Sequence, residues 1–183
     1  MRGLFRVFAA LAGITAGLLP SGPAGANTIT RHDLYPAYSP QMVQYLASKG
    51  EVPVVLVGNG YGADLLSRLQ MPGYYPQARF VATDIARRRG GYLVLIFDPK
   101  SVPGGGAACD SPNDVATGTS GLEMNVQAAF CQSGEVMSDA VLTLDRPSGA
   151  GDPALTGGLN QLLSVMLEPR DPNQGDPCKG PSC

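Results

Sequence analysis

A glycine-rich turn is the stretch whose residue types best suit ligand binding. Gly58-Asn59-Gly60-Tyr61-Gly62-Ala63 follows the apolar run Val52–Val57 and opens a helical pattern. The turn formally matches the dinucleotide-binding motif G-x-G-x-x-A, and Asp84 lies at about the distance expected for a ribose-binding acid. We reject nucleotide binding, because the helix is short for a crossover and the segments after it predict hairpins rather than βαβ units. The stretch is then a structural tight turn, whose amides at a helix start suit a small anion.

Residues that would support hydrolysis or acid–base chemistry are sparse. His32 is the only histidine, so any mechanism of the Ser-His-Asp or Cys-His type has to use it. Gly118-Thr119-Ser120-Gly121 does not reach the nucleophile pattern G-x-S-x-G. A carboxylate pair such as Asp64 and Asp84 is able to do acid–base work, but solvated loop acids are far commoner. The sequence therefore predicts no catalytic residue and no cofactor.

The four cysteines are Cys109, Cys131, Cys178 and Cys183, and all follow the N-terminal apolar segment. In an oxidising compartment they predict two disulfides, for which three pairings exist. We favour Cys109–Cys131 and Cys178–Cys183, because each joins sequence neighbours. The larger loop would stabilise the fold by ~3 kcal/mol in the chain-entropy model. A metal site of four thiolates is the alternative, but no C-x-x-C pair is present, and we predict no metal.

Tyrosines gather in the middle of the chain. All seven lie between Tyr35 and Tyr92, and three of them bracket the short helix after the glycine turn. Tyrosine joins apolar area to a hydroxyl, which suits a binding face, although packing at the edge of the core is the commoner use.

The only basic run is Arg87-Arg88-Arg89. We interpret it as a solvated connection between strands, with an anionic contact as the alternative. The candidate ligand-binding residues are Gly58, Asn59, Gly60, Tyr61, Asp64, Tyr74 and Tyr75.

The N-terminus has the three parts of a secretory signal. Arg2 and Arg6 are positive, Val7–Leu19 is apolar, and Ala24-Gly25-Ala26 is an A-x-A cleavage site before Asn27. A membrane anchor is the alternative, but the segment is short and is soon broken by proline and glycine. We therefore predict a cleaved signal over residues 1–26, a single domain over 27–168 and a Pro/Gly-rich tail over 169–183. No later stretch is long enough to span a membrane.

The charge balance argues against nucleic-acid binding. Without Arg2 and Arg6, 11 of the 13 basic residues remain against 15 acidic residues, so the net formal charge is −4. A nucleic-acid-binding domain usually carries a basic face. The composition instead suits a soluble, exported protein.

The elements that must position these residues alternate between helices and strands. Helices are predicted from Ser39-Pro40 to Gly50, over Ala63–Gln70, and from Asp152-Pro153 to Glu168. Strands are predicted over Val52–Val57, Gln77–Thr83, Tyr92–Phe97, Leu122–Cys131 and Val136–Leu144. An irregular arm over Asn27–Tyr38 and a long loop over Val102–Gly121 complete the chain.

The spacing of these strands predicts two β-hairpins. One joins Gln77–Thr83 to Tyr92–Phe97, and the other joins Leu122–Cys131 to Val136–Leu144. The sheet is therefore expected to have about five strands and to be mostly antiparallel, or mixed around Val52–Val57. Amphipathic helices need an apolar sheet face to cover. The predicted fold is an α+β two-layer sandwich.

Several of these segments resemble a group of short exported proteins of Gram-negative bacteria with no assigned activity. The resemblance rests on VPVVLVGNG, YLVLIFDP, the cysteine in the following loop and VQAAFCQSGEV, and covers roughly Ser39–Leu144. Members of the group often show Gly-Asn-Pro-Phe where this chain has Gly58-Asn59-Gly60-Tyr61. The resemblance implies export and supplies no catalytic residue.

Together these features predict a non-catalytic binding or accessory protein of the bacterial envelope, either periplasmic or secreted. Its expected partner is an envelope protein or a glycan. Two alternatives use the Gly58–Asp64 loop: binding of a small glycan or anion, and an enzyme that depends on carboxylates.

Overall fold

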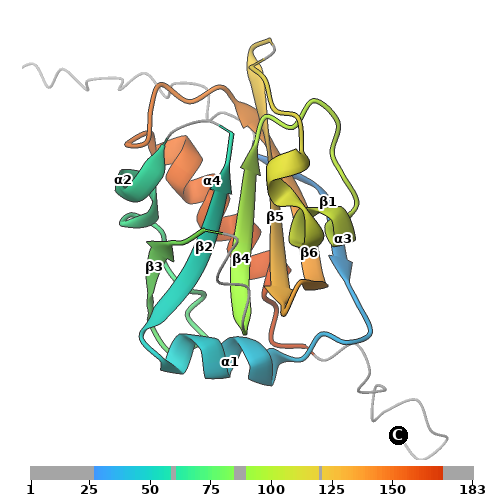
Figure 1. Ribbon diagram of the computed structural model, residues 1–183. Coiled ribbons are helices and arrows are strands. Elements are labelled where there is room, and N and C mark those ends of the chain that lie inside the picture. Colours follow the sequence, from blue (N-terminus) through green and yellow to red (C-terminus); the bar gives the residue numbers. More distant parts are fainter. Residues whose placement is uncertain (1–26, 59–60, 85–89, 120, 171–183) are drawn as a thin grey trace, which may run out of the picture.

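The computed structural model describes residues 27–58, 61–84, 90–119 and 121–170. They form a six-stranded mixed sheet with helices packed on it, which confirms the α+β class (Figure 1). The strand order is β1-β6-β5-β4-β2-β3. The strands are β1 Thr28–Leu34, β2 Glu51–Val57, β3 Arg79–Ala82, β4 Gly91–Phe97, β5 Glu123–Gln132 and β6 Glu135–Asp145.

The helices divide unequally between the two faces of the sheet. The main core lies under α1 (Pro40–Ser48), α2 (Gly62–Leu66) and α4 (Pro153–Met166), whose buried leucines meet the strands. A smaller cluster on the other face lies under α3 (Gly105–Asp110), which a 3₁₀ turn over Pro112–Asp114 follows. Figure 1 shows α3 and α4 on opposite sides of the sheet.

The hairpin predicted between Gln77–Thr83 and Tyr92–Phe97 is wrong. β3 and β4 both run parallel to β2, which lies between them. The physical reason is the burial of β2: Val54 belongs to the main core and Val55 to the smaller one. A strand that is apolar on both faces gains most from a position inside the sheet. The β2–α2–β3 segment is therefore a short βαβ unit, which our argument against nucleotide binding had excluded.

Pro53 is compatible with this interior position. The carbonyl oxygens of Gly50 and Val54 accept hydrogen bonds from the β3 side, so the even-numbered residues of β2 face β3. Pro53 therefore faces β4, whose pairing with β2 begins only at Val54. Proline has no N–H to donate there, so the loss is confined to the first position of the β2–β4 ladder.

The arm expected over Asn27–Tyr38 is instead largely a strand. β1 pairs antiparallel with β6 and forms one edge of the sheet. A register shift between Ile29 and Arg31 interrupts the alternation of inward and outward residues. Because of this bulge, the strand does not show the two-residue period of apolar side chains by which a strand is recognised in a sequence.

The remaining elements follow the sequence more closely. The β5–β6 hairpin is confirmed, with Ser133 and Gly134 at positive φ in its turn. The helix over α4 is confirmed, and Asp152 caps it by accepting a hydrogen bond from the Ala154 N–H at 2.9 Å. The expected long loop differs, because it contains α3 and the 3₁₀ turn. α2 ends at Leu66, four residues earlier than the sequence suggests.

Candidate binding groove

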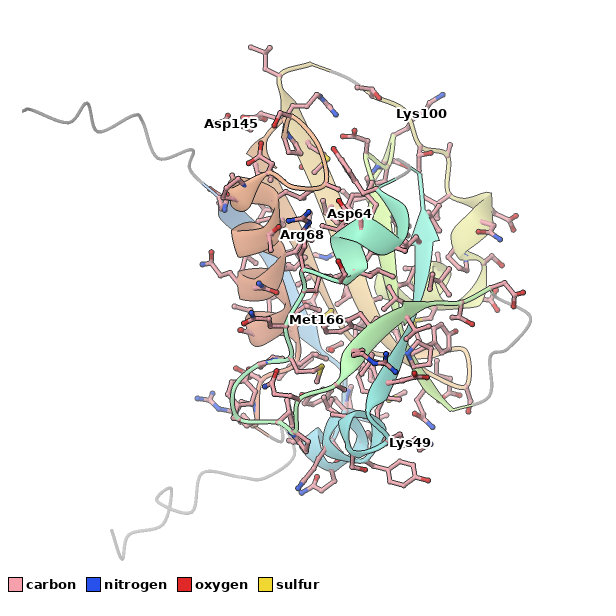
Figure 2. All side chains as sticks on the ribbon, turned by 90° about the vertical axis from the view of Figure 1, so that its left-hand side faces the viewer. Lys49, Asp64, Arg68, Lys100, Asp145 and Met166 are labelled. Atoms are coloured by element: carbon pink, nitrogen blue, oxygen red, sulfur yellow. A yellow bond between two sulfur atoms is a disulfide. The ribbon has the colours of Figure 1, made fainter. Side chains whose placement is uncertain are left out.

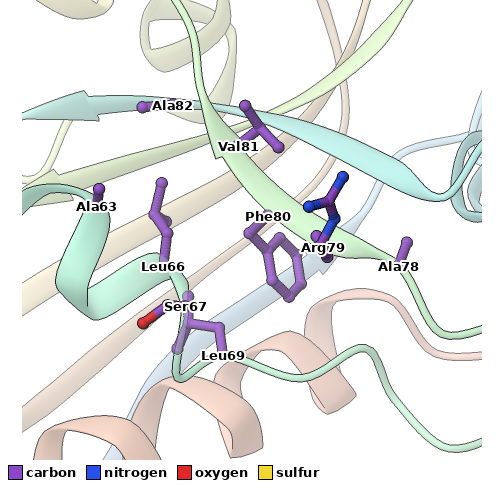
Figure 3. A pocket seen from close by; sticks show the side chains of 9 residues that line it. All are labelled: Ala63, Leu66, Ser67, Leu69, Ala78, Arg79, Phe80, Val81 and Ala82. Carbon is purple, nitrogen blue, oxygen red and sulfur yellow. The ribbon is translucent and has the colours of Figure 1, made fainter.

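A groove lies between α2 and the edge strand β3, next to the glycine turn. Its volume is about 350 Å³, and it is open to solvent. Figure 3 shows Leu66 and Leu69 on one side of it and Phe80 and Ala82 on the other. The lining residues are Ala63, Leu66, Ser67, Leu69, Ala78, Arg79, Phe80, Val81 and Ala82. The groove is therefore mostly apolar. Arg79 is its single charged lining residue, and its side chain points to the face of β3 opposite Phe80, where it pairs with Glu51.

β3 presents an unpaired edge beside this groove. The N–H groups of Arg79 and Thr83 donate to β2, at Gly50 and Val54, over 3.0 and 2.9 Å. Strand geometry then turns the N–H and C=O groups of Phe80 and Ala82 away from β2. No other strand of the described residues pairs with β3. These two residues leave two donors and two acceptors at the outer side of the sheet.

Gly58 ends β2 in a conformation that only glycine adopts easily. Its φ is +90°, and a Cβ placed there would lie 2.5 Å from the Phe97 carbonyl oxygen. The Tyr61 ring packs edge-on against Phe97, with ring centroids 5.4 Å apart. Burial raises the pKa of Tyr61, whose hydroxyl reaches the Met124 sulfur at 3.8 Å. These contacts give the described ends of the turn a packing role; Asn59 and Gly60 lie outside the described residues.

Asp64, the acid predicted to contact a ligand, forms an ion pair on the surface of α2. Its carboxylate accepts a hydrogen bond from Arg68, one helical turn later, at 3.2 Å. Figure 2 shows the two side chains together at the surface. Exposed pairs of this kind stabilise a helix by roughly 0.3–0.5 kcal/mol. Asp64 borders the groove, because its neighbour Ala63 lines it.

Tyr74 and Tyr75 lie at the far end of the crossover that follows α2. The Tyr74 hydroxyl donates to the Ser164 carbonyl of α4, and Tyr75 reaches the Glu168 carbonyl over 3.4 Å. Tyr38 donates to the same Glu168 oxygen over 2.6 Å. Ser164 is among the last four residues of α4, whose carbonyls lack partners within the helix, and Glu168 lies two residues past the helix end. The two predicted ligand residues thus contact α4, and neither lines the groove.

A buried ion pair that the sequence did not indicate lies at the carboxyl end of β4. Asp98 is buried and accepts two hydrogen bonds from Arg146, at 2.7 and 3.3 Å. The same guanidinium donates to the carbonyls of Gly121 and Glu123 at 3.2 and 2.6 Å. The Asp98 contact raises the pKa of Arg146. Arg146 therefore holds the ends of β4, β5 and β6 together.

The disulfide predicted between Cys109 and Cys131 is present and joins α3 to β5. The Tyr92 hydroxyl also donates to the Cys109 carbonyl, at 3.0 Å. The segment before α3 is also held to the sheet. The Pro103 carbonyl accepts hydrogen bonds from Arg31 of β1 and Gln127 of β5 at 3.2 and 3.0 Å. Cys178, Cys183 and the Arg87–Arg89 run lie outside the described residues.

Other classes of site find little support in the described ranges. Within them, no three His, Cys, Asp or Glu side chains are grouped so as to hold a metal ion. His32 lies on β1, at the opposite edge of the sheet from the groove. No helix in the same ranges has both the length and the apolarity of a membrane span. Comparisons with family models, curated proteins and solved structures find no match for this chain.

Proposed function

We propose that this chain is a non-catalytic binding module of the bacterial envelope, and that its ligand occupies the groove between α2 and β3. The observation that carries the proposal is the coincidence of an apolar groove with an unpaired strand edge. Val81 is 41% exposed on that edge, although most apolar side chains of the sheet are buried. Exposed apolar surface beside a recess is typical of a binding site.

The carboxylate enzyme is the weaker alternative. Asp64 borders the groove, but its side chain is exposed and paired with Arg68. An acid–base pair needs a second group within reach, and Asp98 is held by Arg146 instead. Glycan binding is weaker too, since sugars usually stack on an exposed aromatic ring and Phe80 is buried.

The test is a binding screen on the mature chain, followed by two matched variants. Thermal shift against glycans, nucleotides, anions, small aliphatic and aromatic compounds and short peptides identifies a probe. Ala63→Trp fills the groove, whereas Ala107→Trp makes the same change at an exposed position on α3. We expect the bound probe to perturb amide signals of α2 and β3, and Ala63→Trp alone to abolish the effect. A screen without any shift, or equal effects of both variants, would contradict the proposal.

A further inference from the structure

We infer that the ligand is an extended polypeptide segment of a partner protein, which adds a strand to the sheet at the outer edge of β3. This inference rests on the proposed binding function and specifies its partner. The added strand would pair with Phe80 and Ala82, and its alternate side chains would enter the groove beside α2. Strand addition of this kind is a recurring mode of peptide recognition.

The hydrogen-bonding groups needed for such pairing are already in position. Phe80 and Ala82 direct their backbone groups outward, while Arg79 and Thr83 are bonded to β2. The Phe80 side chain belongs to the main core, on the face of the sheet that α2 covers. Successive side chains of a strand alternate between faces, so Ala82 lies on that face as well. Backbone pairing and groove contacts therefore come from the same two residues.

The two edges of the sheet differ in how they are protected against pairing. β1 carries a bulge between Ile29 and Arg31 and the charged pair Arg31–Asp33, with 3.5 Å between Nε and Oδ2. Bulges and charges are the usual means of blocking strand addition. β3 pairs with β2 in an unbroken register and contains no proline, and three of its four residues are apolar. Its protections are its shortness and the single charge of Arg79, and the shortness limits the partner to a short contact.

The lining indicates the chemistry of the segment. Ala63, Leu66 and Ala82 are small or aliphatic, so the inward positions of the partner should be small or aliphatic too. On the opposite face of β3, Arg79 is exposed and donates to Glu51 over 2.7 Å. Arginine has five N–H donors, so the guanidinium retains donors for an acidic side chain of the partner. We therefore expect alternating apolar and polar residues with an acid near Arg79.

The experiment uses capped peptides of about six residues, the usual length of a strand. In the pool, valine, leucine or alanine alternates with threonine or glutamate, and a control pool groups the apolar residues together. Binding to the mature chain is measured by fluorescence polarisation. We expect the alternating pool to bind and the amides of Phe80 and Ala82 to become protected from hydrogen exchange.

Backbone methylation tests the pairing directly. Two derivatives of the best peptide carry N-methyl groups on its odd or on its even residues. Because alternate N–H groups point to opposite edges of a strand, we expect one derivative to bind roughly tenfold or more weakly and the other to bind normally. Equal affinities of both derivatives would overturn strand addition, although groove binding would still be detected by its sensitivity to Ala63→Trp.

A protein variant completes the test. Ala82→Pro removes one outward donor and no bond to β2, a position where edge strands tolerate proline. Ala82→Ser keeps the N–H and serves as the control. We expect only the proline variant to lose binding by roughly tenfold, with melting temperature as the check on folding. If Ala82→Pro does not fold, the comparison of the two methylated peptides still tests strand addition. A dimeric wild type that Ala82→Pro makes monomeric would assign the edge to a second copy and overturn the inference.

Discussion

Gly58 illustrates how a single backbone position fixes the approach of two strands. Its positive φ and its contact with the Phe97 carbonyl are separate constraints. Gly50 has a similar φ of +79°, but a Cβ placed there would meet no atom within 4 Å. Comparing the two glycines therefore separates conformational strain from steric clash.

We predict that Gly58→Ala lowers the free energy of unfolding by about 3 kcal/mol or more, because strain and clash add. Gly50→Ala should cost roughly 1–2 kcal/mol, the strain alone. Urea unfolding of both variants gives the comparison. Equal losses would show that β4 moves aside without cost.

Some of these residue roles were readable from the sequence and others were not. Gly58 and the Cys109–Cys131 pair stood out by residue type and spacing. Asp98 and Arg146 did not, because they are 48 residues apart and each is an ordinary loop charge until the strand ends meet. Tyr74 and Tyr75 do use the predicted property, a hydroxyl on an apolar ring, but the acceptors are carbonyls in and just after α4 rather than a ligand.

At the scale of elements, the tyrosines that bond the C-terminal end of α4 and the residues just after it make stability sensitive to alkaline pH. Burial raises the pKa of Tyr38 well above its usual value, and it raises the pKa of Tyr74 to about 12. The unfolded chain releases these protons near pH 10, whereas the folded chain keeps them. The folded state therefore binds more protons above pH 10, and its stability falls as the pH rises further.

We predict that the unfolding free energy of the wild type decreases between pH 10 and pH 12, and that Tyr38→Phe reduces this decrease. The variant should also lose about 1 kcal/mol at neutral pH, because the Glu168 carbonyl loses a donor. Chemical unfolding at several pH values measures both effects. Tyr45→Phe is the control, since that ring is exposed. Parallel pH profiles for all three proteins would contradict the prediction.

The disulfide links α3 to the sheet and gives a second prediction at this scale. Replacing Cys109 and Cys131 together by serine should lower the unfolding free energy by ~2–4 kcal/mol. Replacing Cys178 and Cys183 should cost much less, because only four residues lie between them. Since Cys109 and Cys131 are buried, a double alanine variant controls for burying two hydroxyls. Peptide mapping without reduction establishes the pairing.

Strong periodic signals predicted the right elements, and weak ones did not. The β5–β6 hairpin and α4 are long and regular, so local patterns were sufficient. Which strand pairs with β3 and with β4 depends on the position of β2 in the sheet, and no local sequence pattern encodes that position. The groove was missed for a related reason: it forms only when the short helix α2 and the short strand β3 come together.

At the scale of the whole molecule, the proposed export with signal cleavage predicts that the mature chain begins at or near Asn27. Asn27 donates to the Ala154 carbonyl of α4 over 3.1 Å, so the expected first residue already belongs to the fold. We predict that N-terminal sequencing of protein from the producing cell begins at Asn27 and that intact mass matches this start. Soluble protein that retains Met1 would contradict both export and the argument for disulfides.

The pairing of β1 with β6 has a consequence for the order in which the chain is made. Arg31 and Asp139 meet across these strands, although 108 residues separate them. A ribosome or a secretion channel releases β1 first, yet its partner is among the last segments to appear. β1 thus has no pairing strand until β6 has emerged, and of the described elements only α4 follows β6. The pairing of β1 with β6 is therefore expected late in folding during synthesis.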